Sequence, residues 1–124
     1  MNVLVVHNFY QQPGGEDAVF RAEVALLQRM GHKVVEFVED NRQIERMNSL
    51  KAAMETVWSW EAQRKLRSLI RETKPEVAHF HNTFMRISPA AYYTCKEAGI
   101  PVVQTLHNYR LLCPAATFLR GRRV

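Results

Sequence analysis

Three adjacent pairs of histidine and asparagine are the side chains in this sequence best suited to binding a ligand. The pairs are His7-Asn8, His81-Asn82 and His107-Asn108. An imidazole donates or accepts a hydrogen bond near neutral pH, and an amide does both at once. Such groups suit a ligand whose neutral, polyhydroxylated part is attached to a phosphate.

A glycine pair, Gly14 and Gly15, follows the first of these pairs. Without Cβ atoms the backbone can come close to a ligand. A helix expected from Glu16 to Met30 would place its free amides and positive dipole end at the same point. The loop therefore predicts a site for a phosphate or a sugar hydroxyl. The alternative is a simple tight turn, and the segment fits neither a Walker loop nor a GxGxxG motif.

Four apolar segments predict the strands that must position these residues. They are Val3–Val6, Lys33–Val38, Glu76–Phe80 and Pro101–Leu106. The first is apolar without alternation, which is typical of a strand covered on both faces. Helices are expected between the strands, at 16–30, at 50–73 with a break near Trp58 to Trp60, and at 88–98. This order predicts an α/β fold, a Rossmann-like parallel sheet with helices on both faces.

Two of these helices carry further expectations. The first should pack on the sheet through its apolar positions Val19, Ala22, Leu26 and Met30, and Gly31 should cap its end. The last should begin with Ser88 as the N-cap and Pro89 as the first helical residue.

The carboxyl ends of parallel strands share one edge of the sheet, where ligands bind. The three pairs should therefore line one cleft together with the glycine loop. A single histidine at a strand end is more often structural, and that alternative stays open for each. Glu39 and Asp40 also end a strand and could hold a ribose, but solvated loop acids are commoner.

Metal and hydrolase chemistry are less favoured. Three histidines suggest zinc, yet no carboxylate triad or cysteine lies near them in the sequence, so no metal is expected. No GxSxG motif is present, and Cys113 simply precedes a proline. Cys95 and Cys113 show no metal or CxxC spacing and are expected to be thiols.

Composition limits the remaining classes. With 124 residues and 47% hydrophobic content, one domain with a real core is expected. The net charge is +5, but Arg120, Arg122 and Arg123 supply three of those charges and no recognition motif accompanies them, so nucleic acid is not an expected partner. No apolar run approaches the roughly 20 residues of a membrane span. With no leader pattern before the first strand, a cytoplasmic location is expected.

Residues 50–74 are basic and include Trp58 and Trp60. A basic segment with interfacial tryptophans can lie on an anionic membrane. The competing and favoured interpretation is an amphipathic helix that packs on the protein and leaves a solvated basic face. The chain could also be a non-catalytic α/β module that binds an anionic ligand or a membrane surface.

Three segments together resemble a known family. HNFYQQPGGED, PEVAHFHNTF and PVVQTLHNYRLLCP are similar to the amino-terminal domain of family 4 glycosyltransferases, which have the GT-B fold. The resemblance follows the whole chain in order, and HNYRLLCP makes it specific. It implies a retaining, usually metal-independent transfer of a sugar from a nucleotide-sugar donor to a glycan, small-molecule or lipid-linked acceptor, with no cofactor.

The resemblance also implies roles for individual residues. Gly14 and Gly15, with Glu16 beside them, correspond to the loop that contacts the donor diphosphate or sugar. His107 corresponds to a catalytic histidine that contacts the transferred sugar. His7, His81, Asn82 and Asn108 would be neighbouring substrate-binding residues. Since many relatives act on membrane-linked acceptors, a peripheral location at the inner face of the cell membrane is a further expectation for residues 50–74.

The chain is shorter than such an enzyme. In the family a second Rossmann-like domain with a paired-glutamate motif grips the nucleotide, and that domain is not in this sequence. Phe118 to Val124 reads as a hairpin turning at Gly121 whose second strand has barely begun. We therefore expect residues 1–124 to be a truncated acceptor-side domain, inactive alone, with an empty glycine loop.

Overall fold

The computed structural model describes residues 1–10, 14–42, 48–109, 112–113 and 118. Within them, four strands pair in parallel in the order β2-β1-β3-β4. The strands are β1 (Asn2–Phe9), β2 (Lys33–Asp40), β3 (Val77–Asn82) and β4 (Val102–Gln104). The predicted α/β class with a parallel sheet is confirmed.

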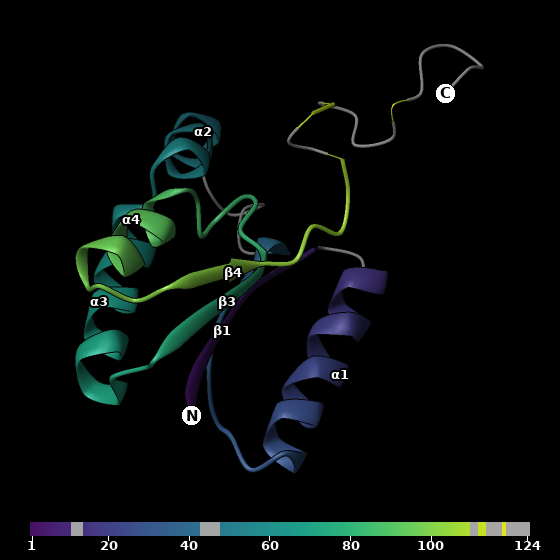
Figure 1. Ribbon diagram of the computed structural model, residues 1–124. Coiled ribbons are helices and arrows are strands. Elements are labelled where there is room, and N and C mark those ends of the chain that lie inside the picture. The colour runs from purple at the N-terminus through teal and green to yellow at the C-terminus, as the bar shows by residue number, and fades with distance from the viewer. Residues whose placement is uncertain (11–13, 43–47, 110–111, 114–117, 119–124) are drawn as a thin grey trace.

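Helices cover both faces of this sheet (Figure 1). They are α1 (Gly15–Arg29), α2 (Ser49–Val57), α3 (Trp60–Thr73) and α4 (Ala90–Glu97). Helix α1 lies on one face, and α3 with α4 lies on the other. The predicted break near Trp58 is confirmed, because Ser59 caps α3 by accepting a hydrogen bond from the Ala62 amide at 3.2 Å.

The central strand β1 contributes side chains to two hydrophobic clusters, one on each face of the sheet. Because side chains alternate along a strand, Leu4 and Val6 point toward α3 and α4, whereas Val3 and Val5 point toward α1. All four are at most 3% exposed. The unbroken apolar run therefore predicted the position of this strand correctly.

The packing face predicted for α1 is wrong. Val19 and Leu26 are nearly half exposed and Met30 is 66% exposed, while Phe20 and Val24 are buried against the sheet. Both stripes have helical spacing, so periodicity alone did not separate them. The stripe that contains Phe20 buries the larger side chain, and aromatic burial dominates the energy of such a contact. Gly31 follows the helix end with a φ of +81°, as expected of a capping glycine.

Several boundaries differ from the prediction by one to three residues. Strands β2 and β3 each run two residues further than expected, and β4 is shorter. Pro89, and not Ser88, occupies the N-cap of α4, although the Ser88 hydroxyl still accepts a hydrogen bond from the Ala90 amide. Of the expected hairpin at 118–124, only residue 118 is described.

The described residues contain neither a membrane-spanning helix nor a disulfide between the two cysteines. No helix there is both long and apolar enough to cross a membrane. Cys95 is buried, Cys113 is half-buried, and the two form no disulfide, as expected.

Candidate functional site

The strand pleat sends the two members of each His-Asn pair in different directions. His7 and His81 lie on the α1 face of the sheet, where their ring centroids are 6.1 Å apart. Asn8 and Asn82 belong to a hydrogen-bond network on the opposite face. The expected single cleft is therefore divided into a histidine cluster and an amide network, because neighbouring residues of a strand face opposite sides.

The histidine cluster continues to the segment that follows β4. His81 Nδ1 lies 3.0 Å from His107 Nε2, and the two rings stack at 5.2 Å. The ring of His79, a residue that the sequence did not single out, also contacts that of His81, tilted by 34° with the centroids 4.6 Å apart. One signal of this contact was available in the sequence, since residues 79 and 81 share a face of the strand.

His7 lies beneath the glycine loop and has no exposed surface. Its Nε2 is 2.7 Å from Asp17 Oδ1, and the other oxygen of Asp17 accepts a hydrogen bond from the Gly14 amide at 3.0 Å. His7 thus supports the loop through Asp17. Sequence reasoning missed Asp17, although an acid in the first turn of a helix is a common capping residue.

The amide network holds the loop after β3. Asn8 donates to Asn41 Oδ1 at 2.8 Å and accepts from the Arg86 amide at 3.1 Å, while its carbonyl accepts from Asn82. Asn41 also donates to the Phe84 carbonyl. Asn8, Asn41 and Asn82 are at most 9% exposed. Asn8 and Asn41 are thus structural, and Asn82 also faces the pocket described next.

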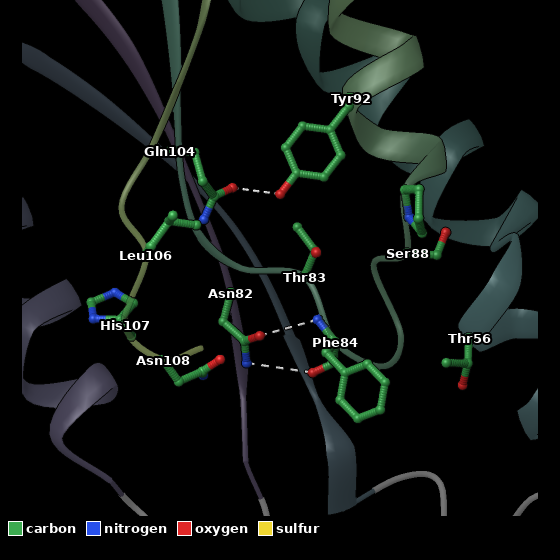
Figure 2. A pocket seen from close by; sticks show the side chains of 11 residues that line it. Thr56, Asn82, Thr83, Phe84, Ser88, Tyr92, Gln104, Leu106, His107 and Asn108 are labelled. Carbon is green, nitrogen blue, oxygen red and sulfur yellow. Dashed lines mark hydrogen bonds between the residues drawn. The ribbon is translucent and has the colours of Figure 1, made fainter. Parts of the chain in front are cut away.

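A pocket of about 280 Å³ opens at the carboxyl edge of β3 and β4. Figure 2 shows its walls, which come from the loop after β3, the start of α4, residue Thr56 of α2 and the segment 104–108. His107, Asn108 and Asn82 line it. Two further lining residues bond each other: the Tyr92 hydroxyl donates to Gln104 Oε1, and Gln104 Nε2 donates to the His81 carbonyl at 3.0 Å.

Asn108 links this pocket to the glycine loop. Its Nδ2 donates to Glu16 Oε1 at 2.8 Å, across a sequence separation of 92 residues. Gly14, Gly15 and Glu16 therefore lie on the α1 side of the segment 105–109, and the pocket lies on its α4 side. The structure places the glycine loop and His107 at one edge of the sheet, as the strand order predicted.

The comparison with protein families shows which family the chain belongs to. Residues 13–123 match the model of Glycosyltransferase Family 4. The chain belongs to this family. Comparisons with curated proteins and with solved structures return no match. The family 4 match runs from the glycine loop through the segment that carries His107, so it covers every part of the pocket.

Two acids at the end of β2 do not face the pocket of this family 4 domain. Glu39 forms ion pairs with Arg86 at 3.0 Å and with Lys65 at 3.0 Å, and its side chain is 9% exposed. Asp40 pairs with Arg42. The Arg42 hydrogen bond lowers the pKa of Asp40. Both carboxylates are thus occupied by protein cations, which favours a structural role over contact with a ribose.

Acid should destabilise the family 4 domain through its buried histidines. Burial, together with the imidazoles of His79, His107 and His7, lowers the pKa of His81 to about 4, and burial also lowers that of His7. Below the ordinary histidine pKa of 6.5, the unfolded chain binds protons that the folded chain excludes. The folded state therefore becomes less stable as the pH is lowered. We expect a loss of about 2 kcal/mol from His81 between about pH 7.5 and pH 5.

Urea unfolding at the two pH values, in the presence of a chelator, measures this loss. Above about pH 5 most carboxylates remain ionised, so they contribute little. The His81→Gln variant should show a weaker pH dependence. An equal loss in that variant would assign the acid sensitivity to other groups.

Proposed function

We propose that this domain is the acceptor side of a retaining glycosyltransferase that uses a nucleotide-sugar donor. The observation that carries the proposal is the pocket at the carboxyl edge of the sheet, where His107 and Asn108 stand between a half-open cavity and a glycine loop. Family membership supports the same class of reaction. In the proposed mechanism the donor diphosphate approaches the loop and the sugar lies against His107.

The chemistry of the loop fits an anion. Backbone amides of the first turn of α1 lie there, although that of Gly14 already donates to Asp17, and the helix dipole adds positive potential. His7 and Asp17 fix the Gly14 end of the loop from below. The protein groups near His107 are imidazoles and amides, which can bind the hydroxyl groups of a sugar.

Catalysis in this proposal needs a second domain. A donor-binding domain would face the carboxyl edge of the sheet, close the cleft and exclude water from the reacting sugar. The test is release of nucleoside diphosphate from a panel of UDP-sugars and GDP-sugars, with and without such a domain. Release by residues 1–124 alone would contradict the acceptor-side assignment. No release by the longer enzyme with any donor and acceptor would contradict the transferase itself.

Gly15→Val separates a ligand role from a folding role for the glycine loop. Neither glycine has a positive φ, and a Cβ on Gly14 or Gly15 would meet no described atom within 4 Å beyond its chain neighbours. The fold therefore tolerates a side chain, whereas a closely bound diphosphate would not. We expect stability to be kept and turnover in the longer enzyme to fall about 10²-fold, since small misplacements have such effects.

Gly31→Ala is the matched control, because it alters the other end of the same helix. Gly31 has a φ of +81°, which strains any other residue, so stability should fall by about 1 kcal/mol. Turnover per folded molecule should be unchanged. If Gly15→Val turned over normally, the loop would have no part in substrate binding.

We further propose that α2 contacts a membrane surface and brings the domain to a lipid-linked acceptor. Helix α2 has no buried residue, and Leu50, Met54, Val57 and Trp60 are each at least 64% exposed. They border a hollow of about 780 Å³ that is mostly apolar. Thr56 of the same helix lines the pocket, so a bound surface would lie beside it.

The remainder of 50–74 supports the favoured interpretation from the sequence. Helix α3 packs through Ala62, Leu66 and Ile70, while Lys65 and Arg67 on its outer side pair with carboxylates. Trp58 is half-buried against Tyr93 at 5.4 Å, and Trp60 is 72% exposed. The proposed contact is therefore confined to α2 and Trp60 and is more apolar than basic.

Vesicle co-sedimentation tests this contact. The domain should sediment with vesicles of phosphatidylcholine and phosphatidylglycerol, and Met54→Asp should reduce the bound fraction several-fold, because a carboxylate would enter the interface. Val19→Asp alters an exposed apolar residue of α1 and should have no effect. Equal loss in both variants, or no sedimentation of the unaltered domain at low salt, would contradict the proposal.

A further inference from the structure

Two members of the histidine cluster meet a carboxylate between α1 and β3, outside the pocket, and form a smaller cluster with it. It consists of Glu23 from α1 and of His79 and His81 from β3. One ligand atom from each residue lies within 4.8 Å of the others. The two histidines are two residues apart on one strand and therefore point to the same face, where the helix supplies the carboxylate.

Both histidines have their other ring nitrogen engaged. His79 Nε2 lies 2.8 Å from the Thr105 hydroxyl, and His81 Nδ1 lies 3.0 Å from His107 Nε2. These contacts orient the free nitrogen of each ring toward Glu23. Histidines that bind a metal nearly always have this arrangement, in which an outer partner fixes the ring and its tautomer.

Among the described residues, one atom of the cluster is left without a hydrogen-bond partner. His81 Nε2 is buried, the side chain has 0% exposure, and the nearest Glu23 oxygen is 3.5 Å away. His79 Nδ1 is 2.7 Å from Glu23 Oε1, so a direct hydrogen bond satisfies this nitrogen. The same carboxylate does not satisfy His81 Nε2 in this way. Two ligands of a tetrahedral zinc ion stand about 3.3 Å apart, which is close to the separation at His81.

We propose that His79 Nδ1, His81 Nε2 and a Glu23 carboxylate oxygen bind one Zn²⁺ ion, with water in the fourth position. Two imidazoles and one carboxylate are a ligand set that zinc accepts, and Mg²⁺ or Ca²⁺ would require more oxygen ligands. Glu23 is 29% exposed and His79 is 13% exposed, so the ion can enter from solvent. The site differs from a set built on the three strand-end histidines, because it shares only His81 with them.

The ion would join α1 to β3 and act on the neighbouring site. With Nε2 bound to zinc, a neutral His81 carries its proton on Nδ1 and donates it to His107 Nε2. The other nitrogen of a neutral His107 would then carry the proton and act as a donor. Zinc binding itself does not depend on the proposed sugar transfer, so either proposal can fail alone.

Zinc titration of the tag-free chain after dialysis against a chelator tests the site. We expect one Zn²⁺ per chain, measured by competition with a chromophoric chelator, and a visible Co²⁺ spectrum of the intensity typical of four-coordination. Glu23→Gln should weaken zinc binding by more than about 10-fold. Thr105→Val keeps all three ligands and loses only the outer contact, and it should weaken binding about 10-fold.

Glu36→Gln is the matched control, because it removes an exposed carboxylate of β2 outside the cluster. It should bind zinc as tightly as the unaltered chain. Circular dichroism shows whether each variant is folded. If Glu23→Gln does not fold, Thr105→Val still tests the site, because valine has nearly the same shape as threonine. A folded unaltered chain that takes up no zinc would overturn the proposal. Equal zinc affinity in Glu23→Gln, Thr105→Val and Glu36→Gln would also overturn it, because zinc would then bind elsewhere.

Discussion

His107→Ala should lower the kcat of the longer transferase by about 10² to 10³-fold and leave the domain folded. Removal of a single preorganised donor at a reacting centre has an effect of this size. His107 is half-buried, and its contact with His81 is the one hydrogen bond of its ring that the described structure shows. Its loss should therefore change the melting temperature little, so a fall in kcat would report on chemistry.

The control for this prediction is His32→Ala. His32 lies between α1 and β2, at the opposite edge of the sheet from His107. Its replacement should leave kcat unchanged. Product release from a nucleotide-sugar panel, together with thermal melting, measures both variants. A normal kcat in folded His107→Ala would make His107 structural and would remove the strongest part of the proposed mechanism.

Asn8→Ala should lower the free energy of unfolding by about 3 kcal/mol. The side chain is fully buried and bonds both Asn41 and the Arg86 amide. Alanine would leave these two partners buried without a hydrogen bond, and each such group costs about 1 to 3 kcal/mol. The loop 83–88, which forms one wall of the pocket, would lose its attachment to β1.

Denaturant unfolding measures this change. Asn48→Ala is the matched control, because Asn48 is an exposed asparagine that caps α2 by accepting from the Leu50 amide. It should cost about 1 kcal/mol, as is usual for an N-cap. A cost for Asn8→Ala no larger than that of Asn48→Ala would show that the amide network is not important for stability.

The sequence predicted the elements whose determinants are local. The run Val3–Val6 predicted a strand buried on both faces, and Gly31 predicted the end of α1. The break before α3 followed from the loss of a common apolar face around Trp58, and Ser59 caps the new helix. Each of these depends on a few neighbouring residues, and the family resemblance depends on short contiguous segments.

The tertiary structure decided everything that depends on which face a residue occupies. Periodicity left two stripes on α1, and only contact with the sheet selected Phe20 and Val24 over Val19 and Leu26. The strand pleat sent His81 and Asn82 to different sites. Asp17 and Glu23 became functional candidates only because α1 packs over the histidines of β1 and β3.

The three histidine-asparagine pairs show the division clearly. Their types and their places after predicted strands were enough to locate the binding edge of the sheet, because all parallel strands end there. Their roles required distances between residues far apart in the chain, such as Asn108 to Glu16 and His81 to His107. Sequence thus determined the fold and the edge, and packing determined which side chains meet, since those contacts join residues that no local pattern relates.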